Sequence, residues 1–207
     1  MAQYFVIHPT HPQPRLIARA AEIVRAGGVI AYPTDSCYAL GALVGDKAAT
    51  ERMRRIRGVD ERHHFTLMCR DLSELGTYAR VDNRQYRLLK ALTPGSYTFI
   101  LEGTRDLPRR ILHPRRKTIG LRVPAHAVAA ALLAALGAPL LSTTLALAGD
   151  EAPLEDAAAI RRRLESELEL VLDAGACGTT PTTVVDLTGA TPEVVREGKG
   201  PVAAFLR

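Results

Sequence analysis

The chain has 207 residues, 47% of them apolar and 24% charged, and its formal net charge of +5 modestly favours polyanionic partners such as nucleotides or RNA. A single domain of this length, residues 1–207, buries roughly 70% of its unfolded surface and needs no disulfide or metal in order to fold. The apolar run at 128–136 is far shorter than the ~20 residues that span a bilayer, and residues 1–10 lack a signal-peptide pattern, so we expect a cytoplasmic protein with no membrane partner.

Strands and helices are predicted to alternate along the N-terminal half of the chain. The expected elements are, in order, a strand at 3–7, a helix at 15–26, a strand at 29–33, a helix at 46–57, and short helices that begin after Asp71 and Asp82. Helix 15–26 is expected because its apolar residues recur every three or four positions and a Gly-Gly pair follows it. Asp46, Asp71 and Asp82 are expected to cap their helices with a side-chain carboxylate.

The C-terminal half ends in strands that follow one another without a helix between them. Strands are expected at 97–101, 118–123, 140–143, 170–172, 183–187 and 194–196, with helices at 125–136 and 156–168. A parallel pair of strands needs a long crossover, which the last strands lack. We therefore predict an α/β (α+β-like) protein with an open, twisted, mixed β-sheet flanked by helices.

Small hydroxyl side chains follow several of the predicted strands. They are Thr34 and Ser36 in YPTDSCYALG, Ser142 and Thr144 in PLLSTTLAL, and Thr182 in PTTVVDLTG. Such side chains can donate hydrogen bonds to an anionic ligand, but they also stabilise turns by bonding to their own backbone. No GxGxxG fingerprint or Walker A loop accompanies them, so a nucleotide would have to bind in a less common way.

Arginines form the second group of candidate residues. The segment ERMRRIRGVDERHHF carries the cluster Arg52, Arg54, Arg55 and Arg57. This run is either a solvated helix face or a phosphate site, because guanidinium groups pair well with phosphate oxygens. The adjacent His63 and His64 point opposite ways in an extended segment, and the three cysteines include no CxxC pair, so no metal site is expected.

Two more arginines lie in or beside predicted strands. Arg122 belongs to the apolar segment KTIGLRVP, which begins with Lys117 and Thr118, and Arg196 lies beside glycines in VVREGKG. A guanidinium buried in a strand needs an anionic partner, which is either a structural carboxylate or a bound ligand. Several hydroxyls and arginines without a nucleophile–base pair favour anion binding and electrostatic stabilisation over hydrolysis.

A second hypothesis from the charge pattern is a module that recognises the backbone of RNA, either tRNA or double-stranded RNA. The basic clusters lie at 52–57, 109–117 and 161–163. The candidate RNA-binding residues are Arg52, Arg54, Arg55, Arg115, Arg116 and Lys117. The alternative for 161–163 is an amphipathic helix whose arginines pair with Glu165 and Glu167.

Seven ordered segments together resemble the YrdC-like family over nearly the whole chain. They are GGVIAYPTDSCYALG, the arginine-rich helix, TPGSYTFIL, KTIGLRVP, PLLSTT, PTTVVDL and VVREG. The resemblance implies an open twisted sheet with a concave cavity lined by positive charge. The best-understood members are L-threonylcarbamoyladenylate synthases, which join threonine, bicarbonate and ATP, release pyrophosphate, and supply the intermediate for the N6-threonylcarbamoyl group of tRNA.

The same resemblance implies a set of binding residues. Thr34 would lie in the threonine pocket, and Arg122 would be a candidate for the amino-acid carboxylate on the strand that holds both ligands. The full set for ATP or AMP and L-threonine is Thr34, Ser36, Arg57, Thr118, Arg122, Ser142, Thr144, Thr182 and Arg196. Mg²⁺ is expected only as part of the bound ATP, because no dedicated carboxylate cluster is present.

The chain departs from the synthases at two motifs. Synthases carry Lys-x-Arg after the second helix, where this chain has Arg57 and Val59, and Ser-x-Asn after a later strand, where it has Thr144 and Ala146. Loss of one preorganised donor typically lowers kcat by roughly 10²–10³. The chain is instead similar to the YciO branch of the family. A weak synthase, an enzyme for a different acyl–nucleotide substrate and a non-catalytic RNA-binding module all stay open, as does the oligomeric state.

Overall fold

The structure, a computed structural model, describes residues 1–205. The strands are β1 (Gln3–Val6), β2 (Ile30–Tyr32), β3 (Ala39–Leu43), β4 (Thr66–Met68), β5 (Tyr97–Glu102), β6 (Thr118–Arg122), β7 (Leu140–Thr144), β8 (Leu170–Asp173), β9 (Thr183–Asp186) and β10 (Glu193–Arg196). The helices are α1 (Pro14–Arg25), α2 (Lys47–Arg57), α3 (Leu72–Tyr78), α4 (Asn83–Leu92), α5 (Ala127–Leu136) and α6 (Ala157–Leu164), with 3-10 turns η1 (Arg109–Ile111) and η2 (Ala203–Phe205).

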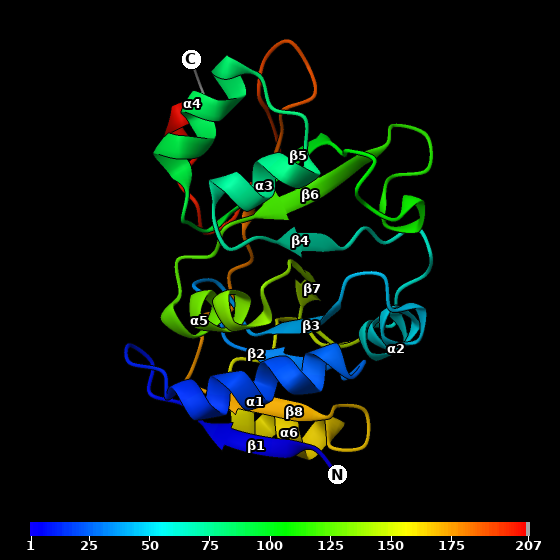
Figure 1. Ribbon diagram of the computed structural model, residues 1–207, viewed down its shortest axis with the longest axis vertical. Helices are drawn as coiled ribbons and strands as arrows, with labels where there is room; N and C mark the ends of the chain where they lie inside the picture. The colour runs from blue at the N-terminus through cyan, green and yellow to red at the C-terminus, as the bar shows by residue number, and fades with distance from the viewer. Residues whose placement is uncertain (206–207) are drawn as a thin grey trace.

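All ten of these strands belong to one mixed sheet, in the order β1-β8-β2-β3-β7-β4-β6-β5-β9-β10. Pairs such as β4–β6 and β5–β9 are parallel, whereas β3–β7, β4–β7 and β5–β6 are antiparallel. Figure 1 shows the strands stacked along the long axis of the molecule, from β1 near the bottom to β5 and β6 near the top. The predicted open, mixed sheet flanked by helices is confirmed.

The three predicted aspartate caps are confirmed. Asp46 accepts from the amide of Ala49 at 2.9 Å, and Asp71 caps α3 in the same way. Asp82 makes a capping box with Gln85 at the start of α4. Each carboxylate satisfies amide groups that have no partner inside the helix, which fixes where these helices begin.

The helices cover the two faces of the sheet unequally. On one face, α1 and α5 pack together over β8, β2, β3 and β7, in a core cluster that includes Ile17, Tyr32 and Leu132. On the other face, α2, α3, α4 and α6 contribute to a second cluster that reaches along most of the sheet. On this first face the cluster formed with α1 and α5 reaches β4 only at Met68, and the polar side chains described below occupy the face beyond it.

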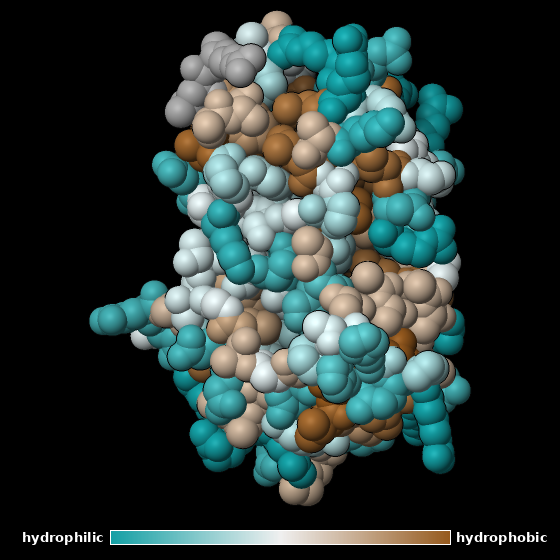
Figure 2. All heavy atoms as spheres, turned by 90° about the vertical axis from the view of Figure 1, so that its left-hand side faces the viewer, coloured by the Kyte–Doolittle hydropathy of each residue, from teal (hydrophilic) through white to brown (hydrophobic). Residues whose placement is uncertain are grey.

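Two strands and one helix end differ from the sequence prediction. β3 and β4 were not expected, because ALGAL is rich in small residues of low strand propensity and TLM has only three residues. The helix predicted at 156–168 ends at Leu164, and Leu168 is buried beyond its end. Figure 2 shows apolar surface in separate patches among hydrophilic side chains on one side of the molecule. Within residues 1–205, no helix combines the length and the apolar character needed to cross a membrane.

A candidate anion-binding cavity

A cavity of about 200 Å³ lies on the part of the sheet that α1 and α5 leave bare. Its floor comes from alternate residues of neighbouring strands, including Ser142 on β7, Thr66 on β4 and Gly120 on β6. Ser142 is paired with Thr66 and Thr66 with Gly120 across the sheet, so these three positions lie in one row on the same face. Small side chains in this row leave the space that larger ones would fill.

Arg122 is held at one side of the cavity by a buried carboxylate. Its Nη2 lies 2.5 Å from Asp35 Oδ1, and its Nη1 donates to Ser36 Oγ at 3.1 Å. Only 8% of the Arg122 side chain and 12% of the Asp35 side chain are exposed. Burial alone raises the pKa of the Asp35 carboxyl, but the charge of Arg122 and a hydrogen bond from Ser96 outweigh it and hold that pKa below its usual range. Of the two partners that the sequence left open for Arg122, the structure contains the structural carboxylate.

Arg57 and Arg196 face the same cavity without a carboxylate. Arg57 Nη1 donates to the carbonyl of Ala146 at 2.6 Å, and Arg196 donates from Nε and Nη2 to the carbonyl of Thr182 at 3.2 and 2.8 Å. Neither side chain makes an ion pair within residues 1–205. Burial lowers the pKa of both guanidiniums, and for Arg57 the charge of Arg196 lowers it further, although an arginine stays protonated. The carbonyls orient two positive charges but do not neutralise them.

Hydroxyl groups make up much of the remaining lining. Thr34 Oγ1 lies 3.1 Å from Ser36 Oγ and donates to the carbonyl of Cys37 at 2.6 Å. Ser142 Oγ lies 2.7 Å from the phenol of Tyr32, and burial raises the pKa of that phenol to about 12. These hydroxyls are held in place by protein groups: Thr34 Oγ1 also accepts from the amides of Ser36 and Cys37, and Ser142 Oγ donates to the carbonyl of Leu40.

Eight of the nine ligand-binding residues named from the sequence line this one cavity. They are Thr34, Ser36, Arg57, Arg122, Ser142, Thr144, Thr182 and Arg196. Thr118 lies at the start of β6, buried and outside the lining. Thr98 and Thr143 also line the cavity but were not predicted from the sequence, because a hydroxyl in the middle of a strand resembles ordinary strand composition. His63 and His64 line it too, although the sequence predicted only that adjacent histidines do not share a metal.

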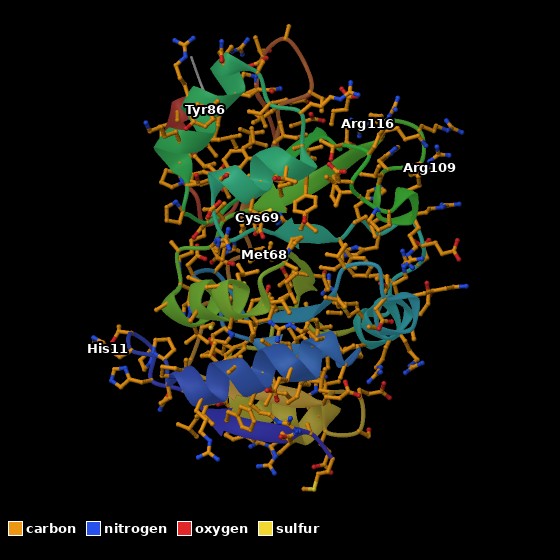
Figure 3. All side chains as sticks on the ribbon, viewed as in Figure 1. His11, Met68, Cys69, Tyr86, Arg109 and Arg116 are labelled. Atoms are coloured by element: carbon orange, nitrogen blue, oxygen red, sulfur yellow. The ribbon has the colours of Figure 1, made fainter. Side chains whose placement is uncertain are left out.

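Most of the candidate RNA-binding residues already make ion pairs or hydrogen bonds within the protein. Three on α2 form ion pairs: Arg52 with Glu169, Arg54 with Glu51, and Arg55 with Glu167. Arg116 pairs with Asp186 at 3.2 Å, and Lys117 Nζ donates to the carbonyl of Pro114, whereas Arg115 makes no ion pair within residues 1–205. Figure 3 shows Arg109 and Arg116 on the segment between β5 and β6, at one edge of the molecule.

The arginines at 161–163 do not use the partners suggested for them. Arg163 pairs with Asp150 through both terminal nitrogens, at 2.8 and 3.0 Å. The guanidinium of Arg161 lies 5.2 Å from the centre of the Tyr4 ring. The expected pairs with Glu165 and Glu167 are absent among the described residues, because Glu167 turns toward Arg55 on α2. This cluster therefore supports the junction of α6 with its neighbours.

The two segments in which the sequence resemblance predicts departures from the synthase motifs meet at one edge of the cavity. Arg57, at the end of α2, bonds to the carbonyl of Ala146, and Gly58 lies against Ala148. No group of three or more histidine, cysteine or acidic side chains within residues 1–205 could hold a metal ion. The donors of this site therefore suit an anion and do not fit a resident metal.

Comparisons with known proteins are consistent with this geometry. The model of the family Sua5_yciO_yrdC, described as telomere recombination, matches residues 22–198. YciO of Escherichia coli (strain K12) is 58% identical over 206 residues, 100% of both chains, and its crystal structure gives a TM-score of 0.96. The threonylcarbamoyl-AMP synthase of Nitrosococcus oceani is 37% identical over 154 residues, 74% of this chain and 82% of the synthase. P. abyssi Sua5 complexed with L-threonine is 25% identical, with a TM-score of 0.86 over 94% of this chain and 57% of that one.

Proposed function

Because this chain belongs to the Sua5/YciO/YrdC family, we propose that its cavity binds an adenine nucleotide, ATP or AMP, together with a small amino acid such as L-threonine. The observation that carries this proposal is the pair Arg57 and Arg196, a half-buried and an exposed cation that face one cavity without a carboxylate partner within residues 1–205. A partly desolvated charge without a counter-ion costs free energy, so a site that keeps it is suited to a ligand that supplies the opposite charge. Phosphate oxygens do so, and guanidinium is their strongest partner among side chains.

The cavity also supports a division of roles among its arginines. Arg122 already shares its charge with Asp35, and it holds the Thr34 and Ser36 hydroxyls at one end of the site. We assign to it the positioning of the amino-acid end. Arg57 and Arg196 then take the phosphates, and Mg²⁺ enters with ATP as part of the substrate.

The reaction that fits this arrangement is adenylyl transfer at a low rate. Negative charge on the phosphate oxygens would be stabilised by Arg57 and Arg196, in the manner of threonylcarbamoyl-AMP synthases. Val59 and Ala146 stand where synthases have an arginine and an asparagine, so two donors of the synthase site are missing. We therefore propose a weak L-threonylcarbamoyladenylate synthase, or an enzyme that uses the same nucleotide site for a different acyl–nucleotide substrate.

The test is to incubate the purified protein with ATP, Mg²⁺, L-threonine and bicarbonate, and to quantify pyrophosphate and threonylcarbamoyl-AMP. A Val59→Arg, Ala146→Asn double variant is assayed beside it. Slow turnover that rises by roughly 10² or more in the double variant supports a weakened synthase site. If neither protein shows turnover but both still bind AMP, the site acts on a different acyl–nucleotide substrate. Failure of AMP and ATP to bind at all overturns the proposal.

A second candidate function, RNA binding, rests on a groove beside the cavity. The groove has a volume of about 510 Å³ and is lined by Arg109, Arg110 and Lys117, and it shares His63, His64 and Phe65 with the cavity. An extended polyanion such as tRNA or double-stranded RNA could therefore lie in the groove with one nucleotide in the cavity. Contacts of this kind go to the backbone and depend strongly on salt.

The RNA hypothesis is tested by measuring the affinity for tRNA and for duplex RNA between 50 and 200 mM salt, in steps of about 50 mM. An Arg109→Gln, Arg110→Gln variant should weaken binding for all sequences and reduce the salt slope by about one for each phosphate that these arginines neutralise. Affinity that is independent of salt, or a slope that the variant leaves unchanged, would rule out this groove as the RNA site.

A further inference from the structure

His63 lies where the cavity meets the groove. It belongs to the segment between α2 and β4, and its side chain lines both spaces. Its Nε2 is 3.2 Å from Thr143 Oγ1 on β7, and its ring meets the Phe65 ring edge-on with centres 5.5 Å apart. Packing on Phe65 and contact with Thr143 hold the imidazole in one place at the wall of the site.

The charges that face His63 are mostly positive. Arg57 and Arg54 approach it from α2, and His64 adjoins it in the chain; β7 contributes only the hydroxyl of Thr143. The one carboxylate that acts on it is Asp60 of its own segment, and that carboxylate accepts a hydrogen bond from the amide of Arg62. Burial, and next the charge of Arg57, hold the pKa of His63 below its usual value. These effects favour the neutral form of the ring in the free protein.

A doubly charged ligand would reverse this balance. Phosphate oxygens beside Arg57 and Arg196 cancel the positive field that disfavours a protonated ring. They also offer the ring a charge-assisted hydrogen bond, which favours its charged form. Cavity and ring are already in contact, so no movement of the backbone is needed for this change.

We propose that His63 is a further binding residue of this cavity, which takes up one proton from solvent when a phosphate-bearing ligand enters and then donates a hydrogen bond to it. This inference rests on the proposed nucleotide site and adds a preference for ligand charge. A dianionic phosphate gains the extra contact, whereas an uncharged nucleoside at the same place does not. The residue next to it, His64, also lines the cavity but is exposed and lies against His113, with ring centres 4.9 Å apart.

The sign of the pH dependence follows from the two protonation states. Ligand raises the pKa of His63 from a value that lies below 6.5 in the free protein. Binding therefore takes up a proton between the free and bound pKa values, is tightest below the free pKa, and loses the contribution of His63 above the bound pKa. A rise of one unit corresponds to about tenfold tighter binding at the acid end.

The experiment uses inorganic sulfate, a dianion with no titratable proton near neutral pH. The pKa of His63 is measured by NMR of the imidazole carbon-bound protons, with and without saturating sulfate, at ionic strength held constant with chloride. A His63→Gln variant assigns the signals, and His11→Gln, at an exposed histidine outside the linings of the cavity and the groove, is the matched control. Sulfate affinity is measured on all three proteins from about pH 4.5 to about pH 8.5, which brackets the range of roughly pH 5 to 8 in which histidines titrate.

We expect sulfate to raise the pKa of His63 by at least about one unit, and wild-type affinity to increase about tenfold as the pH falls. The His63→Gln variant should match the wild type at the alkaline end and lose that increase, while His11→Gln keeps it. Bound sulfate that leaves the pKa of His63 unchanged overturns this inference and leaves the nucleotide site standing. Absence of both sulfate and AMP binding at every pH overturns the two together.

Discussion

At the scale of single residues, Asp35 joins four parts of the chain. Its carboxylate accepts from Arg122 on β6 and from Ser96, just before β5, at 2.6 Å. It also accepts from the amide of Ala125, before α5, at 3.1 Å, and its backbone carbonyl accepts from Lys199 near the C-terminus. One side chain thus fixes the turn after β2 relative to the strands that form the cavity.

We predict that Asp35→Asn lowers the free energy of unfolding by about 3–5 kcal/mol at pH 7, because it leaves the buried Arg122 charge without a partner. The folded-state pKa of Asp35 is lowered, so its stabilisation is complete above the unfolded-state value near 3.8 and is lost as the pH falls through the folded value. Urea unfolding of both proteins from pH 7 to pH 3 should therefore show a difference that shrinks toward acid. A constant difference would mean that the carboxylate charge is not the stabilising feature.

A second prediction at this scale concerns Arg196, one of the two cavity arginines that make no ion pair within residues 1–205. Arg196→Gln should weaken AMP binding by about 10–100-fold, the worth of one charged hydrogen bond of roughly 1.5–3 kcal/mol. Arg15→Gln is the matched control, since Arg15 is exposed on α1 and distant in the fold from the cavity lining. Calorimetric titration with AMP measures both. Equal affinities for the two variants would remove Arg196 from the site.

At the scale of elements, the end of α2 shapes the cavity edge. Gly58 ends the helix with φ of 64°, in the left-handed region, and a Cβ built there would lie 2.6 Å from the Cβ of Ala148. The C-cap of α5, Gly137, has nearly the same φ of 67° but has no atom within 4 Å of such a Cβ. The two glycines share a backbone conformation and differ in what surrounds them.

Comparing alanine substitutions at these two glycines separates the cost of backbone strain from the cost of steric contact with a neighbouring side chain. Gly137→Ala should lower the free energy of unfolding by about 1–2 kcal/mol, the cost of a left-handed alanine. Gly58→Ala should cost about 1–3 kcal/mol more, because its methyl group overpacks against Ala148. Only Gly58→Ala should also weaken AMP binding, since Arg57 is displaced. Urea unfolding and AMP titration check this, and equal losses in both variants would contradict it.

The elements differ in how far the sequence predicts them. Asp46, Asp71 and Asp82 are local features, since a cap depends on amides two or three residues away, and all three were predicted. β3 and β4 were not, because short segments of alanine, glycine or threonine become strands only through pairing with distant partners. The cavity shows the same limit. Thr34 and Arg122 were named from their motifs, but Asp35 as the partner of Arg122 required the tertiary fold.

At the scale of the whole molecule, the site exists because one face of the sheet is only partly covered. α1 and α5 pack on the strands from β8 to β7, and helices on the opposite face contribute to the larger core. The strands β4, β6, β5 and β9 can then be stabilised from one side, so their other side is free to carry polar and small residues. The fold thereby separates the part of the sheet that stabilises the protein from the part that binds.

This separation predicts that the cavity can be filled at little cost in stability. A Cβ at Gly120 would lie 3.0 Å from Thr98 Cγ2 and 3.5 Å from Thr66 Oγ1, at the cavity floor. Gly120→Val should weaken AMP binding more than tenfold, with Gly120→Ala intermediate, while the strand preference of valine offsets part of the crowding. Thermal unfolding should shift by only a few degrees, about 1 kcal/mol or less. A large loss of stability with unchanged AMP affinity would contradict the placement of the site.

The hydrogen bond between Arg57 and the carbonyl of Ala146 has an evolutionary consequence. The two segments in which we expect departures from the synthase motifs are in contact, so we expect the effect of a replacement in one segment to depend on the other. A lineage passing between the two kinds of site by single substitutions would meet intermediates that are worse than either end. Such epistasis would keep the two kinds of site apart long after their common ancestor.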